Sequence, residues 1–231
     1  MEMEMIGSST QINFFINNTL LQADSKAILK LVPFIEDGFV PSFGEEVTEN
    51  NVKNKIFRIE KEFDGFNYII TFGTQVVSFQ FDTPSIPVQD DLFDNFRQLL
   101  DKLINVFHNE LPLVNRVSVV INQGYHYHSD LDVRLHGKFF KPQVIPSEWN
   151  FRRAIATEFE NIPIYHVIAI TKGHAIINIR GEVSEKETIL LTVDNNVDIG
   201  RVSKKFKFDD LSFISPLFLK SVSDFYSTLE G

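Results

Sequence analysis

The residues best suited to chemistry lie together between Tyr125 and Asp132, in the order Tyr-His-Tyr-His-Ser-Asp-Leu-Asp. If this segment is a strand, side chains two residues apart point to the same side of it. His126, His128 and Asp130 would then converge, and imidazoles and carboxylates are common ligands of zinc and other transition metals. The pattern predicts a metal site here. The alternative interpretation is a strand end whose polar side chains face water, because no further ligand stands at a diagnostic spacing.

Other catalytic arrangements have weaker signals. Serine, histidine and aspartate are all present, but no Gly-x-Ser-x-Gly elbow occurs. No phosphate loop or dinucleotide fingerprint occurs either, so no cofactor is expected. Adjacent carboxylates at 45–46, 90–91 and 209–210 lie in an expected loop or at expected helix starts, where acidic groups complement the helix dipole. Residues 194–198, Asp-Asn-Asn-Val-Asp, offer oxygen ligands but lack the spacing of a calcium loop.

Basic residues gather at two places in the second half of the chain. They are Arg201, Lys204, Lys205 and Lys207 in one segment, and Arg152 and Arg153 in another. Because positive charge attracts acidic groups, these side chains are candidates for contact with an acidic partner surface. The alternative interpretation is the solvated side of a strand or loop.

Composition limits the classes of function. The net charge is −9, which is opposite to that of most proteins that bind a nucleic-acid backbone or an anionic membrane. The 231 residues include no cysteine, which excludes disulfides and thiol chemistry. We expect a cytoplasmic protein, because the sequence shows no signal peptide and no apolar run long enough to span a bilayer. Most of the 23 phenylalanines are expected in the core.

Hydrophobic periodicity divides the first half of the chain into a strand, a helix, a loop, a meander and a long helix. The expected elements are a strand at 11–17, a helix capped by Asp24 and ended by Asp37, a surface loop over 37–55, strands at 56–63, 66–72 and 75–81, and a helix over about 91–110. Asp64-Gly65 and Gly73-Thr74 stand where hairpin turns are needed.

The second half shows a related order. The expected elements are a strand at 115–127, irregular structure over 128–146, a short helix over about 148–160, strands at 164–171, 175–181 and 188–194, and a last helix that begins at Ser215 and Pro216 and continues to about Leu229. Lys172-Gly173 is expected to form the first turn of this second meander.

The two halves together predict an α+β fold. We expect duplicated antiparallel meander-plus-helix units that form one mixed or antiparallel sheet system covered by helices. Residues 1–231 would then be a single compact domain of two pseudo-repeats, with approximate halves 10–114 and 115–231.

Several short segments also carry a resemblance. They are a Val-Asn-Arg-Val stretch at 114–117, a strand ending in Val120-Ile121-Asn122, a strand ending in Thr192-Val193-Asp194-Asn195, and a last helix with Leu219-Lys220-Ser221-Val222 and Phe225. In these segments the chain resembles a sporadically distributed, uncharacterised bacterial family of similar length, at the positions Arg116, Asn122, Asp194 and Phe225. The resemblance implies a fold and a bacterial or phage origin, and the scattered occurrence of the family implies a defence or toxin-related locus.

The sequence favours a non-enzymatic binding, sensing or adaptor protein, because no convincing catalytic set is present. The expected partner is a protein encoded nearby; nucleic acid is disfavoured, and no membrane association is expected. Two alternatives stay open: a metal-dependent hydrolase that uses His126, His128 and Asp130, and a carrier of a small apolar ligand in a Phe-lined cavity. Homodimer formation through an edge strand of a meander also stays open.

Overall fold

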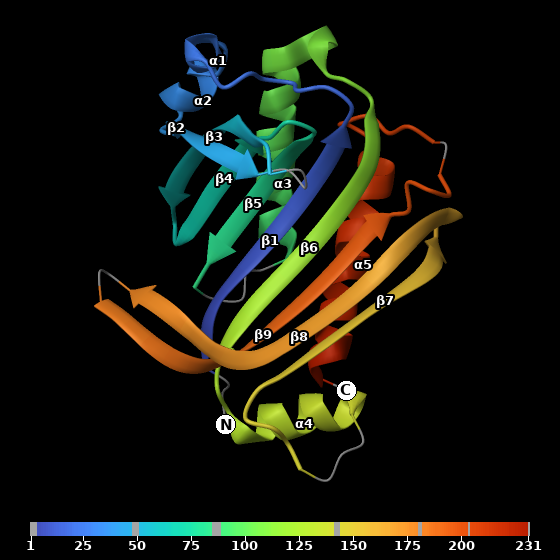
Figure 1. Ribbon diagram of the computed structural model, residues 1–231. Coiled ribbons are helices and arrows are strands. Elements are labelled where there is room, and N and C mark those ends of the chain that lie inside the picture. Colours follow the sequence, from blue (N-terminus) through green and yellow to red (C-terminus); the bar gives the residue numbers. More distant parts are fainter. Residues whose placement is uncertain are drawn as a thin grey trace.

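The described part of the computed structural model comprises residues 4–47, 51–84, 89–140, 144–179, 182–202 and 204–230. These residues form one nine-stranded sheet in the order β2-β3-β4-β5-β1-β6-β9-β8-β7, and every neighbouring pair is antiparallel (Figure 1). The expected α+β class with an antiparallel sheet is confirmed.

The strands are β1 (Met5–Ile16), β2 (Val40–Val47), β3 (Lys53–Phe63), β4 (Phe66–Phe72), β5 (Val76–Thr83), β6 (Val114–His126), β7 (Trp149–Phe159), β8 (Ile162–Ile179) and β9 (Glu182–Val197). The helices are α1 (Ser25–Lys30), α2 (Val32–Glu36), α3 (Gln89–Phe107), α4 (Ser129–Phe139) and α5 (Leu211–Glu230), with a short 3₁₀ helix at His108–Glu110. No helix within the described ranges combines the length and apolarity needed to cross a bilayer.

The two halves of the chain meet in the middle of the sheet, where β1 pairs with β6. In each half, this central strand also pairs with the last strand of a meander: β1 with β5, and β6 with β9. The meander then continues outward to the sheet edge, through β4 and β3 to β2 on one side and through β8 to β7 on the other. A long helix, α3 or α5, follows each meander in the sequence.

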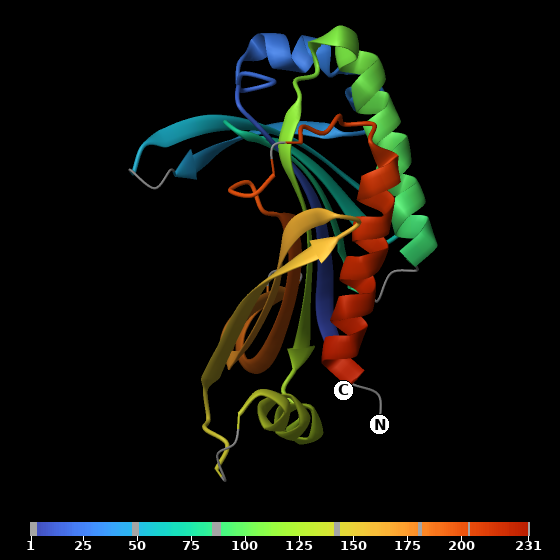
Figure 2. The same cartoon turned by 90° about the vertical axis from the view of Figure 1, so that its right-hand side faces the viewer.

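Both long helices pack on the same face of the sheet, as the side view shows (Figure 2). Strand alternation places Ile12 and Phe14 of β1 on this face, and both are fully buried. The ring of Phe96 on α3 lies 6.3 Å from that of Phe14, and Phe93 lies 5.1 Å from Phe218 of α5. Most of the phenylalanines belong to this buried core, as expected.

Several local predictions are confirmed. The Asp24 carboxylate caps α1 by accepting hydrogen bonds from the backbone N–H of Lys26 (2.8 Å) and Ala27 (3.2 Å). Strand β4 has the predicted bounds. Asp64 and Gly65 both have positive φ, at 52° and 78°, as a tight hairpin turn requires.

The prediction of a surface loop over 37–55 was wrong, because β2 and the start of β3 lie there. Strand β2 pairs with β3 from Val40–Glu60 to Val47–Lys53 and forms one edge of the sheet. An edge strand that is largely exposed carries many polar residues, so its composition is similar to that of a loop.

The predictions for 128–160 were also wrong. The segment expected to be irregular contains α4, and the segment expected to be a helix is β7. The apolar residues Trp149, Phe151, Ile155 and Phe159 all stand at odd positions, which is the period of a strand. The spacing of Trp149, Ile155 and Phe159 also fits one face of a helix, which is why the sequence predicts a helix here.

The turn predicted at Lys172-Gly173 does not exist, because both residues lie inside the continuous strand β8. The second meander therefore consists of β7, β8 and β9, rather than of three strands between 164 and 194. The last helix begins at Leu211, four residues before the predicted cap, so Pro216 lies inside α5.

Candidate functional site

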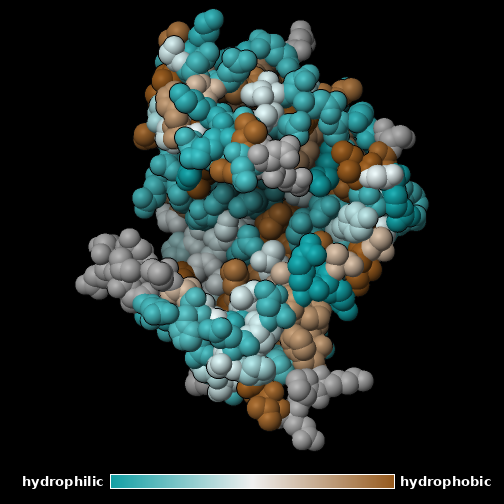
Figure 3. Space-filling model, viewed as in Figure 1, coloured by the Kyte–Doolittle hydropathy of each residue, from teal (hydrophilic) through white to brown (hydrophobic). Residues whose placement is uncertain are grey.

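The face of the sheet opposite α3 and α5 carries no described helix (Figure 2), and we call it the open face. Strand register places the following side chains on it: Arg58, Glu60 and Glu62 (β3), Asn67, Ile69 and Thr71 (β4), Ser78, Gln80 and Asp82 (β5), Ser9, Gln11 and Asn13 (β1), Arg116, Ser118, Val120 and Asn122 (β6), Thr192, Asp194 and Asn196 (β9), Val167 and Ala169 (β8), and Arg152 (β7). Amides, hydroxyls and charges of both signs predominate. Figure 3 shows that this side of the molecule is hollowed.

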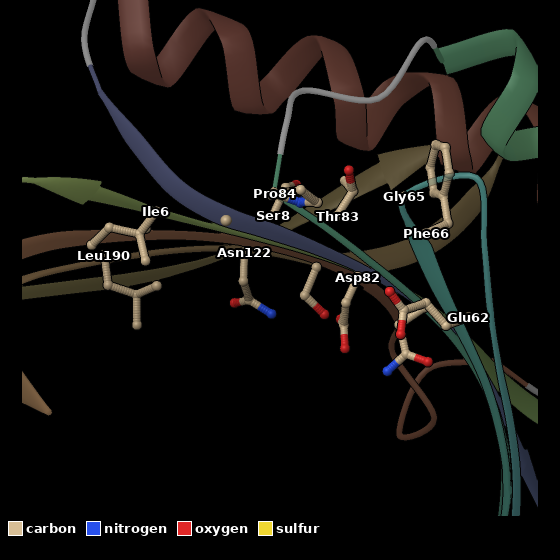
Figure 4. A pocket seen from close by; sticks show the side chains of 14 residues that line it. Ile6, Ser8, Glu62, Gly65, Phe66, Asp82, Thr83, Pro84, Asn122 and Leu190 are labelled. Carbon is tan, nitrogen blue, oxygen red and sulfur yellow. The ribbon is translucent and has the colours of Figure 1, made fainter. Parts of the chain in front are cut away.

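A pocket of about 490 Å³ lies at one end of the open face. Asn122, Asp82 and Glu62 extend into it from three strands and point away from the helices (Figure 4). Asn122 accepts a hydrogen bond from the Thr192 hydroxyl (2.7 Å), and both carboxylate oxygens of Asp82 accept from the Gln80 amide (2.9 Å). The pocket therefore offers side chains whose orientation is already fixed.

The Asp194 carboxylate lies partly buried on the open face. Burial raises the pKa of this carboxyl, although the hydrogen bond from Asn196 and the charges of Arg116 and Arg152 act in the opposite direction. Its Oδ2 accepts from the Asn196 amide at 3.0 Å. Its Oδ1 is buried and has no hydrogen-bond partner among the described residues.

Arg116 supplies the cationic group near Asp194. Its guanidinium stacks on the Phe15 ring, with 3.6 Å from Cζ to the ring centroid. Burial lowers the pKa of Arg116, and the charge of Asp194 partly offsets this. The planar guanidinium is thus held against a ring beside a carboxylate, in a geometry suited to recognition of a polar partner group.

Two further pairs fix the middle of the open face. The Asn13 amide donates to the Ser118 hydroxyl (3.1 Å), and the Gln11 amide donates to Gln80 (3.2 Å). The middle of the face therefore consists of polar groups that are held in place by hydrogen bonds to one another. In contrast, Ser9 Oγ and Arg58 Nε are buried atoms with no partner among the described residues.

The three candidate metal ligands do not share one strand. Strand β6 ends at His126, whose Nε2 lies 3.9 Å from Glu4. His128 is the N-cap of α4, where its Nδ1 accepts a hydrogen bond from the backbone N–H of Asp130 (3.3 Å), the second residue of that helix. The alternation on which convergence depended ends before His128. Within the described ranges, no group of three or more such residues is arranged to hold a metal ion.

The basic residues are dispersed. Arg152 lies on the open face of β7, whereas Arg153 lies on the helix face, 6.0 Å from the Phe139 ring. The Lys205 ammonium donates to Asn115 (2.5 Å), and Lys204 lies near Asp210 (3.8 Å) and 5.0 Å from the Phe206 ring. Arg201 and Lys207 are exposed in the segment between β9 and α5. Of the two that lie on a strand, Arg152 is on the open face and Arg153 is not.

A buried ionic cluster on the helix face was missed by the sequence interpretation. The Lys172 ammonium donates to Asp132 Oδ2 (2.6 Å), and Trp149 Nε1 donates to Asp132 Oδ1 (2.8 Å). Both charged side chains are about 95% buried. Burial lowers the pKa of Lys172, but the hydrogen bond and charge of Asp132 outweigh this and raise it above its usual value. The cluster connects α4 with β7 and β8.

A second polar network connects α5 with the sheet. The Asn195 amide donates to Ser221 Oγ (3.0 Å) and to Asp224 (2.8 Å), and the His166 ring contacts Asn195 (2.9 Å). Ser221 donates its own proton to the Leu217 carbonyl (2.8 Å). A serine whose hydroxyl is used in this way is not arranged as a nucleophile activated by histidine, so the network is structural.

One pocket bears on the prediction of a Phe-lined cavity between sheet and helices. The pocket there, next to Phe218 and Phe225, has a volume of about 20 Å³, which is close to the space that one water molecule needs.

Comparison with protein-family models, curated proteins and solved structures gives no match for this chain.

Proposed function

We propose that this chain is a non-enzymatic binding or adaptor protein that recognises a protein partner through its open face. One observation carries the proposal. Four buried side-chain atoms of the described residues have no hydrogen-bond partner, and three of them, Ser9 Oγ, Arg58 Nε and Asp194 Oδ1, belong to residues of the open face. These atoms lie beneath a face whose polar side chains are already held in place, as by the stacking of Arg116 on Phe15 and the hydrogen bond from Asn196 to Asp194, so a partner can bind there without first ordering them.

The mixed charge of the open face favours a protein as the partner. Arg58, Arg116 and Arg152 alternate with carboxylates such as Glu60 and Asp194, and the chain as a whole carries a net charge of −9. A polyanion would meet repulsion from these carboxylates, whereas a protein surface offers charges of both signs.

The two halves are proposed to be duplicated units, because each places its first strand beside the last strand of its meander and follows that meander with a long helix. The proposed setting is the cytoplasm of a bacterium, in a defence or toxin-related locus with the partner encoded nearby. That setting rests on the family resemblance in the segments around Arg116 and Asp194.

The test compares matched variants on the two faces. Tagged wild-type protein first isolates its partner from the native host, and the purified pair is then titrated. Arg116→Ala and Asp194→Asn should each weaken binding about tenfold or more, as interface anchors do. Arg97→Ala and Asp94→Asn, which change an exposed pair on α3, should leave affinity unchanged. Equal losses on both faces, or no partner in repeated isolations, would refute the proposal.

A further inference from the structure

The two edges of the sheet differ in their protection against pairing. Strand β2 has eight residues, which include Pro41, Gly44 and the adjacent acids Glu45 and Glu46. Proline and charge on a short strand are devices that prevent an edge from adding another strand. Strand β7 has eleven residues with neither proline nor glycine, and it pairs with β8 along its full length without a register shift.

The outer side of β7 has unused pairing capacity. Its residues from Arg152 to Ala156 are all exposed, and Ile155 at their centre is 41% exposed. An edge strand presents a row of backbone N–H and C=O groups that a further strand can complete. An uncharged Ala-Ile-Ala centre on such an edge is suited to close approach of another chain.

We propose that the chain forms a homodimer in which β7 of two copies pairs antiparallel about a twofold axis at Ile155. A second copy of the chain fits this edge because the sequence of β7 is complementary to itself when two copies run antiparallel. With Ile155 opposite the partner's Ile155, the residues that face each other are Arg152 and the partner's Glu158, Ala154 and the partner's Ala156, and Phe151 and the partner's Phe159. The twofold axis forms the Arg–Glu pair twice, and each facing pair lies on one face of the joint sheet.

Neighbouring registers lack this match. An axis at Ala154 places Glu158 opposite the partner's Asn150 and leaves Arg152 opposite an alanine. An axis at Ala156 places Glu158 opposite an alanine and Arg152 opposite the partner's Glu160, which lies beyond the end of β7. The Ile155 register pairs opposite charges within the strands while placing like apolar groups together. It also joins the open faces of the two copies into one surface, because the axis runs perpendicular to the sheet.

The absence of cysteine allows a sharp cross-linking test, because one introduced thiol is the only one present. Ile155→Cys places the two thiols opposite each other, with Cβ atoms about 5 Å apart, so mild oxidation should give a covalent dimer. Thr157→Cys is the matched control on the same face of β7. In the dimer, the thiol at position 157 and the partner's thiol at position 157 are offset by four residues along the strands, or about 13 Å, which is too far for a disulfide.

A charge-swap series tests the register in solution by light scattering coupled to size exclusion. Wild-type protein should have twice the chain mass of 26.6 kDa. Arg152→Glu and Glu158→Arg should each weaken the dimer about tenfold or more, because two like-charge pairs replace two opposite ones. The combined variant should restore it, and Arg153→Glu, on the other face, should have no effect. The proposal would be overturned if the wild-type protein were a monomer at every concentration. It would also be overturned if Arg152→Glu and Glu158→Arg each left the dimer affinity unchanged.

Discussion

The ionic cluster beneath α4 offers the most direct test of how this fold is held together. Asp132→Ala removes the carboxylate that accepts from Lys172 at 2.6 Å and from Trp149 at 2.8 Å. The Lys172 ammonium, with 5% of its side chain exposed, then keeps Glu187 at 3.4 Å, the Pro146 carbonyl at 3.3 Å and the Tyr127 ring at 4.6 Å from its centroid. Removing one partner of a buried ion pair costs about 3–5 kcal/mol, and the lower end applies here because Lys172 loses its closest carboxylate but keeps Glu187.

For a chain of this size, a loss of about 3 kcal/mol lowers Tm by roughly 6–12 °C. Chemical unfolding followed by fluorescence measures the loss, and Trp149 is the only tryptophan, so its emission reports on the cluster itself. Replacing both charges, as Asp132→Leu with Lys172→Met, should recover most of the stability.

The exposed Lys53–Glu45 pair, at 3.0 Å, provides the matched control, and Glu45→Gln should cost less than about 1 kcal/mol. A loss of that same small size for Asp132→Ala would refute the assignment of a buried, mutually dependent pair.

Two further predictions concern the open face and the core. Because the pKa of Asp194 is raised in the folded protein, the stability that this group contributes is present below the ordinary carboxyl pKa of about 3.9 and is lost as pH rises through the raised value. Asp194→Asn should therefore be more stable than wild type near neutral pH, with a difference that shrinks on acidification in thermal melts. Phe96→Ala should cost about 3–5 kcal/mol in denaturant unfolding, because its fully buried ring packs against the rings of Phe14, Phe79 and Phe93.

Predictions succeeded where the conformational preferences of adjacent residues are enough to determine the local structure. The Asp64-Gly65 turn and the Asp24 cap depend on the conformational preferences of a few adjacent residues, so the sequence is sufficient to identify them. The long helix α3 is marked by apolar residues at helical spacing, among which Leu92, Phe96 and Leu103 are buried.

Predictions failed where partners distant in the sequence decide the structure. Lys172-Gly173 has the composition of a turn, yet Lys172 lies inside β8 because Asp132, forty residues earlier, neutralises it. The residues of β7 fit two patterns, a helical spacing of Trp149, Ile155 and Phe159 and an alternation typical of a strand, and pairing with β8 along the whole length of β7 decides for the strand.

At the candidate site, too, the sequence suggests individual residues, whereas contacts between distant segments decide their arrangement. The sequence offered Arg152 as a candidate for partner contact and Arg116 and Asp194 as positions of family resemblance, but gave no reason to place the three on one face. That placement follows from the order β6-β9-β8-β7 and its register, which bring together residues from separate parts of the chain.

By itself, the sequence determined the α+β class, the burial of most phenylalanines, the long helix α3 and the tight turns, because periodicity and turn chemistry act over a few residues. The tertiary structure alone decided which face of the sheet carries no described helix, which polar side chains share that face, and which two strands form the edges. These features depend on strand order and register, and those are set by contacts between residues far apart in the chain.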